Sequence, residues 1–112
     1  MSAITTHILD LSTGRPAAGV QITLEIYENS WQKLGEGQTD SDGRLKTLHP
    51  PGSPLKDCTY RLTFAIGPYL ERTAGQAFYP EAQIAFQASA RESHYHIPLL
   101  LSPFGYSTYR GS

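Results

Sequence analysis

Apolar and polar residues alternate one by one between residues 20 and 26. Val20, Ile22, Leu24 and Ile26 are apolar, whereas the residues between them are Gln, Thr and Glu. A period of two is typical of a β-strand, because successive side chains of a strand point to opposite faces of the sheet. The segment is therefore predicted to be a strand that buries one face.

The rest of the chain repeats this kind of segment at short intervals, with turn residues between the segments. Residues 31–39 are the expected hairpin partner of the alternating strand, after the turn residues Asn29 and Ser30. Residues 67–74 form the one expected helix, of one or two turns. The other expected strands are residues 4–9, 44–48, 58–66, 83–88, 93–101 and 106–110. About eight short strands predict an all-β sandwich.

No linker, internal repeat or low-complexity segment divides the 112 residues. We therefore expect a single domain over residues 1–112. A domain of this size buries a core but cannot also enclose a large internal pocket. An active site would then be a shallow surface cleft or would be shared between subunits.

Composition excludes several classes of protein. The net charge is −1 and the pI about 6.4, so no basic patch indicates nucleic-acid binding. The longest apolar run, residues 97–101, contains Pro98 and is too short to cross a membrane. Residues 1–10 lack the features of a signal peptide, the last residues are not a peroxisomal Ser-Lys-Leu signal, and Cys58 has no partner for a disulfide. These features favour a cytoplasmic protein.

The four histidines, His7, His49, His94 and His96, are the first candidates for chemistry. His94 and His96 would lie on one face of a strand, as in some metal sites, but no cysteine or carboxylate cluster accompanies them. Spacing alone therefore favours surface or hydrogen-bonded histidines.

Three separated motifs carry a family resemblance. They are THILD with GRPA at residues 6–10 and 14–17, TDSDGR at residues 39–44, and HYHIPLLLSPFGYSTYRGS at residues 94–112. In sequence, order and spacing these motifs resemble those of the 5-hydroxyisourate hydrolases, which share their fold with the hormone carrier transthyretin. The final YRGS matches the tetrapeptide that separates the enzymes from the carrier.

The resemblance implies a transthyretin-like β-sandwich of two four-stranded sheets with one short helix. It also implies a homotetramer, a dimer of dimers with active sites at the dimer–dimer interface. The implied reaction opens the ring of 5-hydroxyisourate to 2-oxo-4-hydroxy-4-carboxy-5-ureidoimidazoline in urate degradation, without a metal or other cofactor.

The same resemblance implies two sets of site residues. The catalytic set is His7, Arg44, His96 and Ser112, and the substrate-binding set is Tyr109, Arg110 and Gly111. Because the motif match selects His96, His94 is expected to be exposed or to lie behind His96.

These residue types suit the chemistry. A histidine titrates near neutral pH and therefore serves as an acid or base, and Arg44 offers a planar set of donors to substrate oxygens. Ser112 would position the water through its hydroxyl or a terminal carboxylate. The sequence leaves open which histidine is the base.

Two other functions remain open at this level. The first is a non-catalytic carrier of a small aromatic ligand, like transthyretin, although such a carrier would favour an apolar channel. The second is a structural or metal-binding sandwich that uses His94 and His96.

Overall fold

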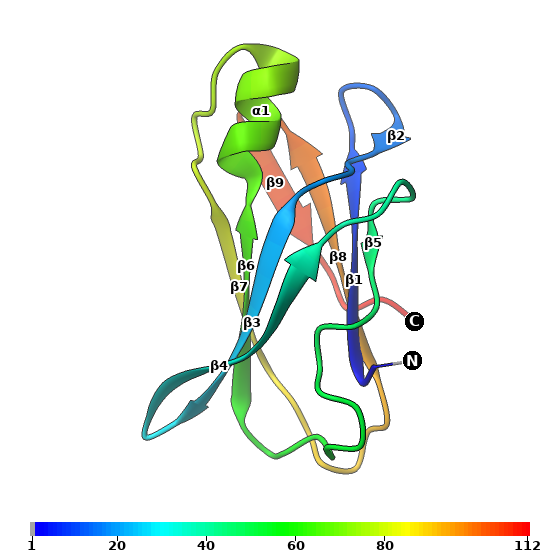
Figure 1. Cartoon of the computed structure of the whole chain (residues 1–112), viewed down its shortest axis with the longest axis vertical. Helices are drawn as coiled ribbons and strands as arrows, with labels where there is room; N and C mark the ends of the chain where they lie inside the picture. The colour runs from blue at the N-terminus through cyan, green and yellow to red at the C-terminus, as the bar shows by residue number, and fades with distance from the viewer. Residues whose placement is uncertain (1) are drawn as a thin grey trace.

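The alternating segment forms β3 (Gln21–Glu28), an inner strand of a four-stranded antiparallel sheet. The computed structural model describes residues 2–112. The order of this sheet is β4-β3-β6-β7, with β4 at Ser30–Gln38, β6 at Thr59–Ala65 and β7 at Ala82–Gln87. Strand β3 is thus paired on both edges, and its apolar face packs into the core (Figure 1).

A second sheet packs against the first and joins the two ends of the chain. Its order is β2-β1-β8-β9, with β1 at Ile4–Asp10, β2 at Arg15–Pro16, β8 at Tyr95–Ser102 and β9 at Gly105–Thr108. A further short strand, β5 (Arg44–Leu45), also pairs with β1. Strands β1 and β8 run parallel, whereas β9 returns antiparallel to β8.

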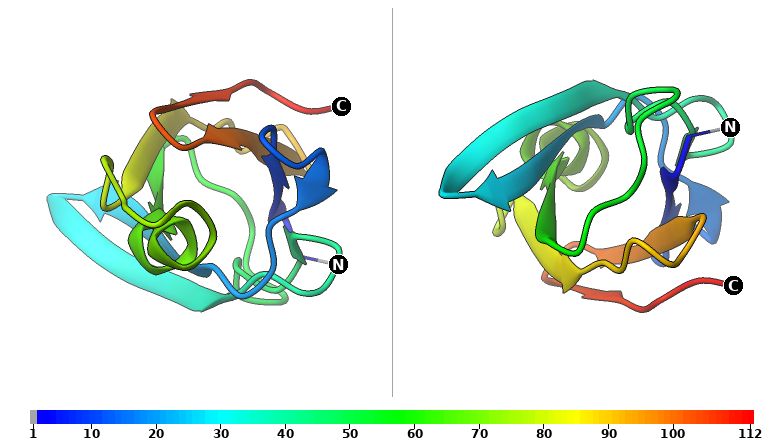
Figure 2. Two further views of the ribbon diagram at one scale, coloured as in Figure 1. Left: turned by 90° about the horizontal axis from the view of Figure 1, so that it is seen from above. Right: turned by 90° about the horizontal axis from the view of Figure 1, so that it is seen from below.

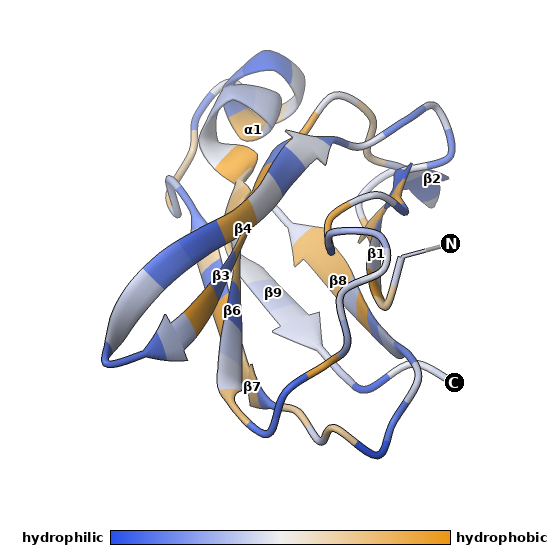
Figure 3. Ribbon diagram, turned by 60° about the horizontal axis from the view of Figure 1, so that its bottom comes forward, coloured by the Kyte–Doolittle hydropathy of each residue, from blue (hydrophilic) through white to orange (hydrophobic). Residues whose placement is uncertain are grey.

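The core lies between the two sheets. Figure 2 shows the sheets as two facing layers, and Figure 3 shows hydrophobic stretches along strands of both. Ile8, Ile22, Leu62 and Leu99 each have 0% of their surface exposed. Because side chains alternate along each strand, burial of Ile8 and Leu99 leaves the neighbouring positions of β1 and β8 on the outer face.

Helix α1 (Ile66–Ala74) closes one end of the sandwich. It ends at Gly75, whose left-handed conformation (φ 82°) lets its N–H bond to the carbonyl of Glu71. The Tyr69 hydroxyl donates a hydrogen bond of 2.7 Å to Asp10 Oδ2, at the end of β1. Burial, together with this bond, raises the pKa of Tyr69 to about 12, so the phenol remains a donor.

The predicted architecture, a transthyretin-like sandwich with one short helix, is confirmed. Two details differ. One sheet has five strands because the two-residue strands β2 and β5 both pair with β1. The strand expected over residues 44–48 ends at Leu45, and Leu48 turns into the core with 1% exposure. Within residues 2–112, no helix is both long and apolar enough to span a membrane.

Candidate active site

Strand pairing places three of the predicted catalytic side chains on one outer face. His7 of β1 is paired with Arg44 of β5, and Thr5 of β1 is paired with His96 of β8. Paired residues of neighbouring strands share a face, and so do residues two apart on one strand. Arg44, His7 and His96 therefore lie together on the side of the sheet that faces away from the core.

The C-terminal residues return to the same place. The ladder between β8 and β9 pairs Leu100 with Ser107, and an isolated bridge in the same register pairs His96 with Gly111. The Gly111 N–H donates a 2.8 Å hydrogen bond to the His96 carbonyl. This bridge carries the chain past His96 and places Ser112 at the site.

An open polar cleft of about 190 Å³ results from these pairings. Arg44, His96 and Ser112, all predicted as catalytic, line it. The other lining residues are Thr5, Thr6, Lys46 and His94. His7 lies beside the cleft through its pairing with Arg44, but is not one of the lining residues.

Two features lower the pKa values of both candidate histidines. Burial is the larger cause for His96, followed by the positive charge of Arg44 and the neighbouring His7 and His94. Burial and then Arg44 also lower the pKa of His7, partly offset by Asp40 and Asp42. Since the ordinary value is 6.5, both rings are mainly neutral at pH 7 and each has a free lone pair.

The turn before β5 positions Arg44. Asp40 Oδ1 accepts hydrogen bonds from the backbone N–H groups of Asp42 (2.8 Å) and Arg44 (3.0 Å). Gly43 has a φ of 73°, and a Cβ there would lie 2.6 Å from the Ile8 carbonyl oxygen, so the turn lies directly against β1. No carboxylate in residues 2–112 forms an ion pair with Arg44, which leaves its guanidinium available to a ligand.

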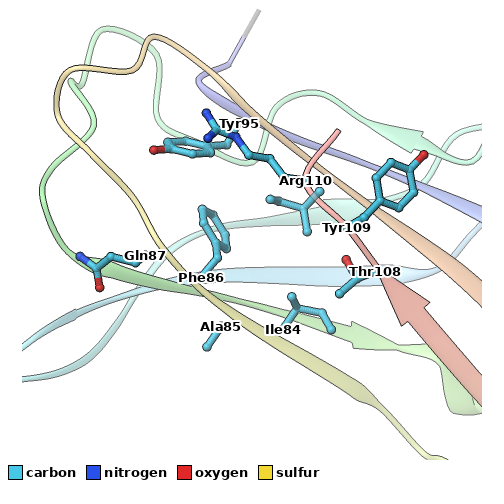
Figure 4. A pocket seen from close by; sticks show the side chains of 9 residues that line it. Ile84, Ala85, Phe86, Gln87, Tyr95, Thr108, Tyr109 and Arg110 are labelled. Atoms are coloured by element: carbon cyan, nitrogen blue, oxygen red, sulfur yellow. The ribbon is translucent and has the colours of Figure 1, made fainter. Parts of the chain in front are cut away.

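Tyr109 and Arg110 line a different cavity, of about 260 Å³, between β7 and the end of β9 (Figure 4). Arg110 lies over the ring of Tyr95 at 4.7 Å and donates a 2.8 Å hydrogen bond to Glu92. Figure 4 shows the Tyr109 ring turned away from Phe86, and 57% of this residue is exposed. A single chain thus does not bring these two side chains into the cleft, and their role in substrate binding stays a prediction.

Sequence reasoning did not select three lining residues, Thr5, Thr6 and Lys46. The period of two offered a signal for two of them, because Thr5 lies two residues from His7 and Lys46 two residues from Arg44. His94 was expected to be exposed or behind His96, and the structure places it half-buried at the cleft. In residues 2–112, no group of three or more His, Cys, Asp or Glu side chains is arranged to hold a metal ion.

The sequence profile of the HIUase/Transthyretin family matches residues 4–111. The chain belongs to this family. It is 46% identical over 110 residues to the 5-hydroxyisourate hydrolase of Salmonella typhimurium, a match that covers 97% of this chain and 80% of the relative.

Solved structures of the HIUase/transthyretin family have the same fold. The structure of Klebsiella pneumoniae 5-hydroxyisourate hydrolase has a TM-score of 0.85 and 39% identity, and the match covers 100% of both chains. Transthyretin from Sparus aurata has a TM-score of 0.88 and 28% identity, over 99% of this chain and 97% of that one. The fold is thus common to enzyme and carrier, and function must be argued from the site.

Gly111→Ala tests whether the terminal motif holds His96 in place. A Cβ on Gly111 would lie 2.7 Å from His96 Cδ2 and 3.1 Å from the His96 carbonyl oxygen. We expect the His96 ring signals to shift in NMR spectra and the free energy of unfolding to fall by about 1–3 kcal/mol, the usual effect of overpacking.

Gly105→Ala is the matched control in β9, since a Cβ there meets nothing within 4 Å. Unchanged His96 signals in Gly111→Ala would show that the close approach of Gly111 does not position the ring.

Proposed function

We infer that this chain is a hydrolase that opens the ring of 5-hydroxyisourate. The observation that carries this inference is the cleft in which His96, Arg44 and Ser112 meet, with His7 alongside. The site occurs in a chain that is 46% identical to a protein named 5-hydroxyisourate hydrolase. A neutral imidazole next to a guanidinium that forms no ion pair within residues 2–112 suits the attack of water on a carbonyl.

In the proposed reaction, His96 takes a proton from water as the water oxygen attacks the ring carbonyl. The lowered pKa of His96 keeps its lone pair available at neutral pH, as a general base requires. Negative charge then develops on the carbonyl oxygen. Arg44 remains protonated and donates hydrogen bonds to that oxygen, and the N–H of neutral His7 is a second donor.

Collapse of this intermediate breaks the bond between carbon and ring nitrogen. The proton held by His96 passes to the leaving nitrogen, which restores the neutral imidazole and leaves the opened ring as a carboxylic acid. Ser112, at the same cleft, orients the attacking water through its hydroxyl, and Gly111 keeps the chain close to His96. No step in this scheme uses a metal or cofactor.

His96→Asn and His7→Leu test the assignment. We expect His96→Asn to lower kcat by roughly 10²–10⁴-fold, the usual contribution of a general base. His7→Leu has no N–H donor in its side chain and should lower kcat by roughly 10²–10³-fold, as expected for loss of one oxyanion donor. The measurement is the decay of freshly generated 5-hydroxyisourate, with circular dichroism to establish that the fold survives.

Gln32→Asn, on exposed strand β4 of the other sheet, is a control that should retain full turnover. If both histidine variants turn over like the unchanged protein, the proposed mechanism is wrong.

The similarity to Sparus aurata transthyretin favours a carrier as the second candidate function. The charged side chains of Arg44 and Lys46 at the cleft argue against it, because a carrier of an apolar ligand needs no cation in its site. The same assay separates the two: a carrier would bind 5-hydroxyisourate or an aromatic ligand saturably without speeding its decay.

EDTA should leave turnover unchanged, and loss of activity restored by zinc would support the metal-binding alternative.

We propose that the site is completed in a homotetramer, a dimer of dimers with active sites between the dimers. A cleft of about 190 Å³ is open and smaller than the roughly 300–1,000 Å³ of typical ligand pockets, and a second subunit placed over it would enclose the substrate. Within residues 2–112, the edge strands β7 and β9 each have one free edge, and they lie side by side (Figure 2). Near them four exposed aromatic side chains contact one another: Phe78, Tyr79, Phe104 and Tyr106. Edge-to-edge pairing would cover both features.

Light scattering should report four times the chain mass of 12.3 kDa. Tyr106→Asp places a charge in the aromatic cluster and should yield smaller species with greatly reduced turnover. Tyr27→Asp is the control, because Tyr27 is 48% exposed and packs on Trp31 in the β3–β4 hairpin. A fully active monomer would contradict the shared site.

We further propose that the protein works in the cytoplasm as one domain, without nucleic acid or membrane partners. A net charge of −1 and a single cysteine support this proposal.

A further inference from the structure

One hydroxyl group connects two of the histidines at the cleft. Thr5 Oγ1 lies 2.8 Å from His96 Nδ1 and 2.9 Å from His94 Nε2. Thr5 is only 4% exposed, so its hydroxyl depends on these rings for hydrogen bonds. The two rings lie nearly parallel, at an interplanar angle of 15° with their centroids 6.5 Å apart.

A hydroxyl has one hydrogen, which limits the protonation of the two rings. Thr5 donates to one ring nitrogen and accepts from the other. When both rings are neutral and both bonds are made, only one of His96 Nδ1 and His94 Nε2 carries a hydrogen. The tautomers of the two histidines are therefore coupled through Thr5.

We propose that Thr5 and His94 are positioning residues that fix the tautomer of His96, an inference that rests on the proposed function. His96 Nδ1–H donates to Thr5 Oγ1, and the Thr5 O–H donates to His94 Nε2. The proton of the neutral His96 ring is then on Nδ1, and the lone pair is on Nε2. Nε2 makes no hydrogen bond to any residue from 2 to 112 and is left for the attacking water.

The opposite chain of hydrogen bonds would disable His96 as a base at Nε2. If His94 Nε2–H donated to Thr5, the Thr5 hydroxyl would donate to His96 Nδ1, and the ring proton would be on Nε2. The hydrogen bond at one ring nitrogen decides which nitrogen carries the proton. His94 thus acts on the reaction through Thr5 and His96, without being the base itself.

Thr5→Val tests the proposal, because Val keeps the branched shape that suits strand β1 but lacks the hydroxyl. We expect kcat to fall on the order of 10–100-fold, as when the partner that orients an imidazole is removed, with KM changed by less than about threefold. Thr5→Ser retains the hydroxyl and should restore most of kcat. Thr23→Val, on strand β3 of the other sheet, is the matched control and should change neither quantity.

The decisive readout is the tautomer of His96, from the ¹⁵N chemical shifts of its ring in labelled protein. We expect the Nδ1–H form in the unchanged protein and in Thr5→Ser, and a larger share of the Nε2–H form in Thr5→Val. A merely structural role for Thr5 would not move this equilibrium. His94 lies before β8, so His94→Phe removes the acceptor without changing a residue of β1. This variant should also shift the tautomer of His96 toward the Nε2–H form.

These measurements separate the inference from the proposed function. If the unchanged protein hydrolyses 5-hydroxyisourate but Thr5→Val and His94→Phe keep full kcat and the Nδ1–H tautomer, the inference is wrong and the function stands. An unchanged protein that does not speed the decay contradicts the function, and the ¹⁵N shifts still decide whether Thr5 couples the two rings. Observation of the Nε2–H form in the unchanged protein also overturns the proposal.

Discussion

The parallel pairing of β1 with β8 is the constraint on which the rest of the structure depends. It joins the first strand of the fold to a strand near the C-terminus, and its register places Ile8 opposite Leu99 and Thr5 opposite His96. One face of this pair belongs to the core and the other to the cleft. A slip of one residue would turn His96 inward and Ile97 outward, so burial of the apolar face fixes the polar site.

Burial and the charge of Arg44 both lower the pKa of the two histidines in the site. Both effects disfavour the protonated forms of His7 and His96. These groups therefore lower the free energy of unfolding as the pH falls below their ordinary pKa of 6.5, and the full cost is reached once the pH is below the lowered values. The lowered pKa values that keep both rings unprotonated for catalysis thus make the folded chain less stable in acid.

Strand periodicity made most of the fold predictable, because a half-buried strand shows its buried face in its sequence. The alternation at residues 20–26 predicted β3. The turn residues at 40–43 predicted the chain reversal that precedes β5. The two-residue strands β2 and β5 were less predictable, since two residues show no period and depend on an available edge of β1. The length of β5 was overestimated because Leu48 turns inward, a tertiary effect.

The site was predictable in part, through the motif match. Arg44, His96 and Ser112 meet at one cleft, but the sequence carried no sign that Arg110 would pair with Glu92 and lie over Tyr95. The role of Thr5 depends on two distances across paired strands, and neither follows from spacing along the chain.

The pH dependence of kcat/KM tests the central claim, that neutral His96 beside Arg44 is the base. The acid limb of the unchanged protein should lie below pH 6.5, the ordinary value, because burial and Arg44 lower the pKa of His96. In Arg44→Met, the weaker activity that remains should have its acid limb at higher pH, since the charge of Arg44 no longer disfavours protonated His96. A limb at or above pH 6.5 in the unchanged protein, or one that does not move in Arg44→Met, would contradict this account.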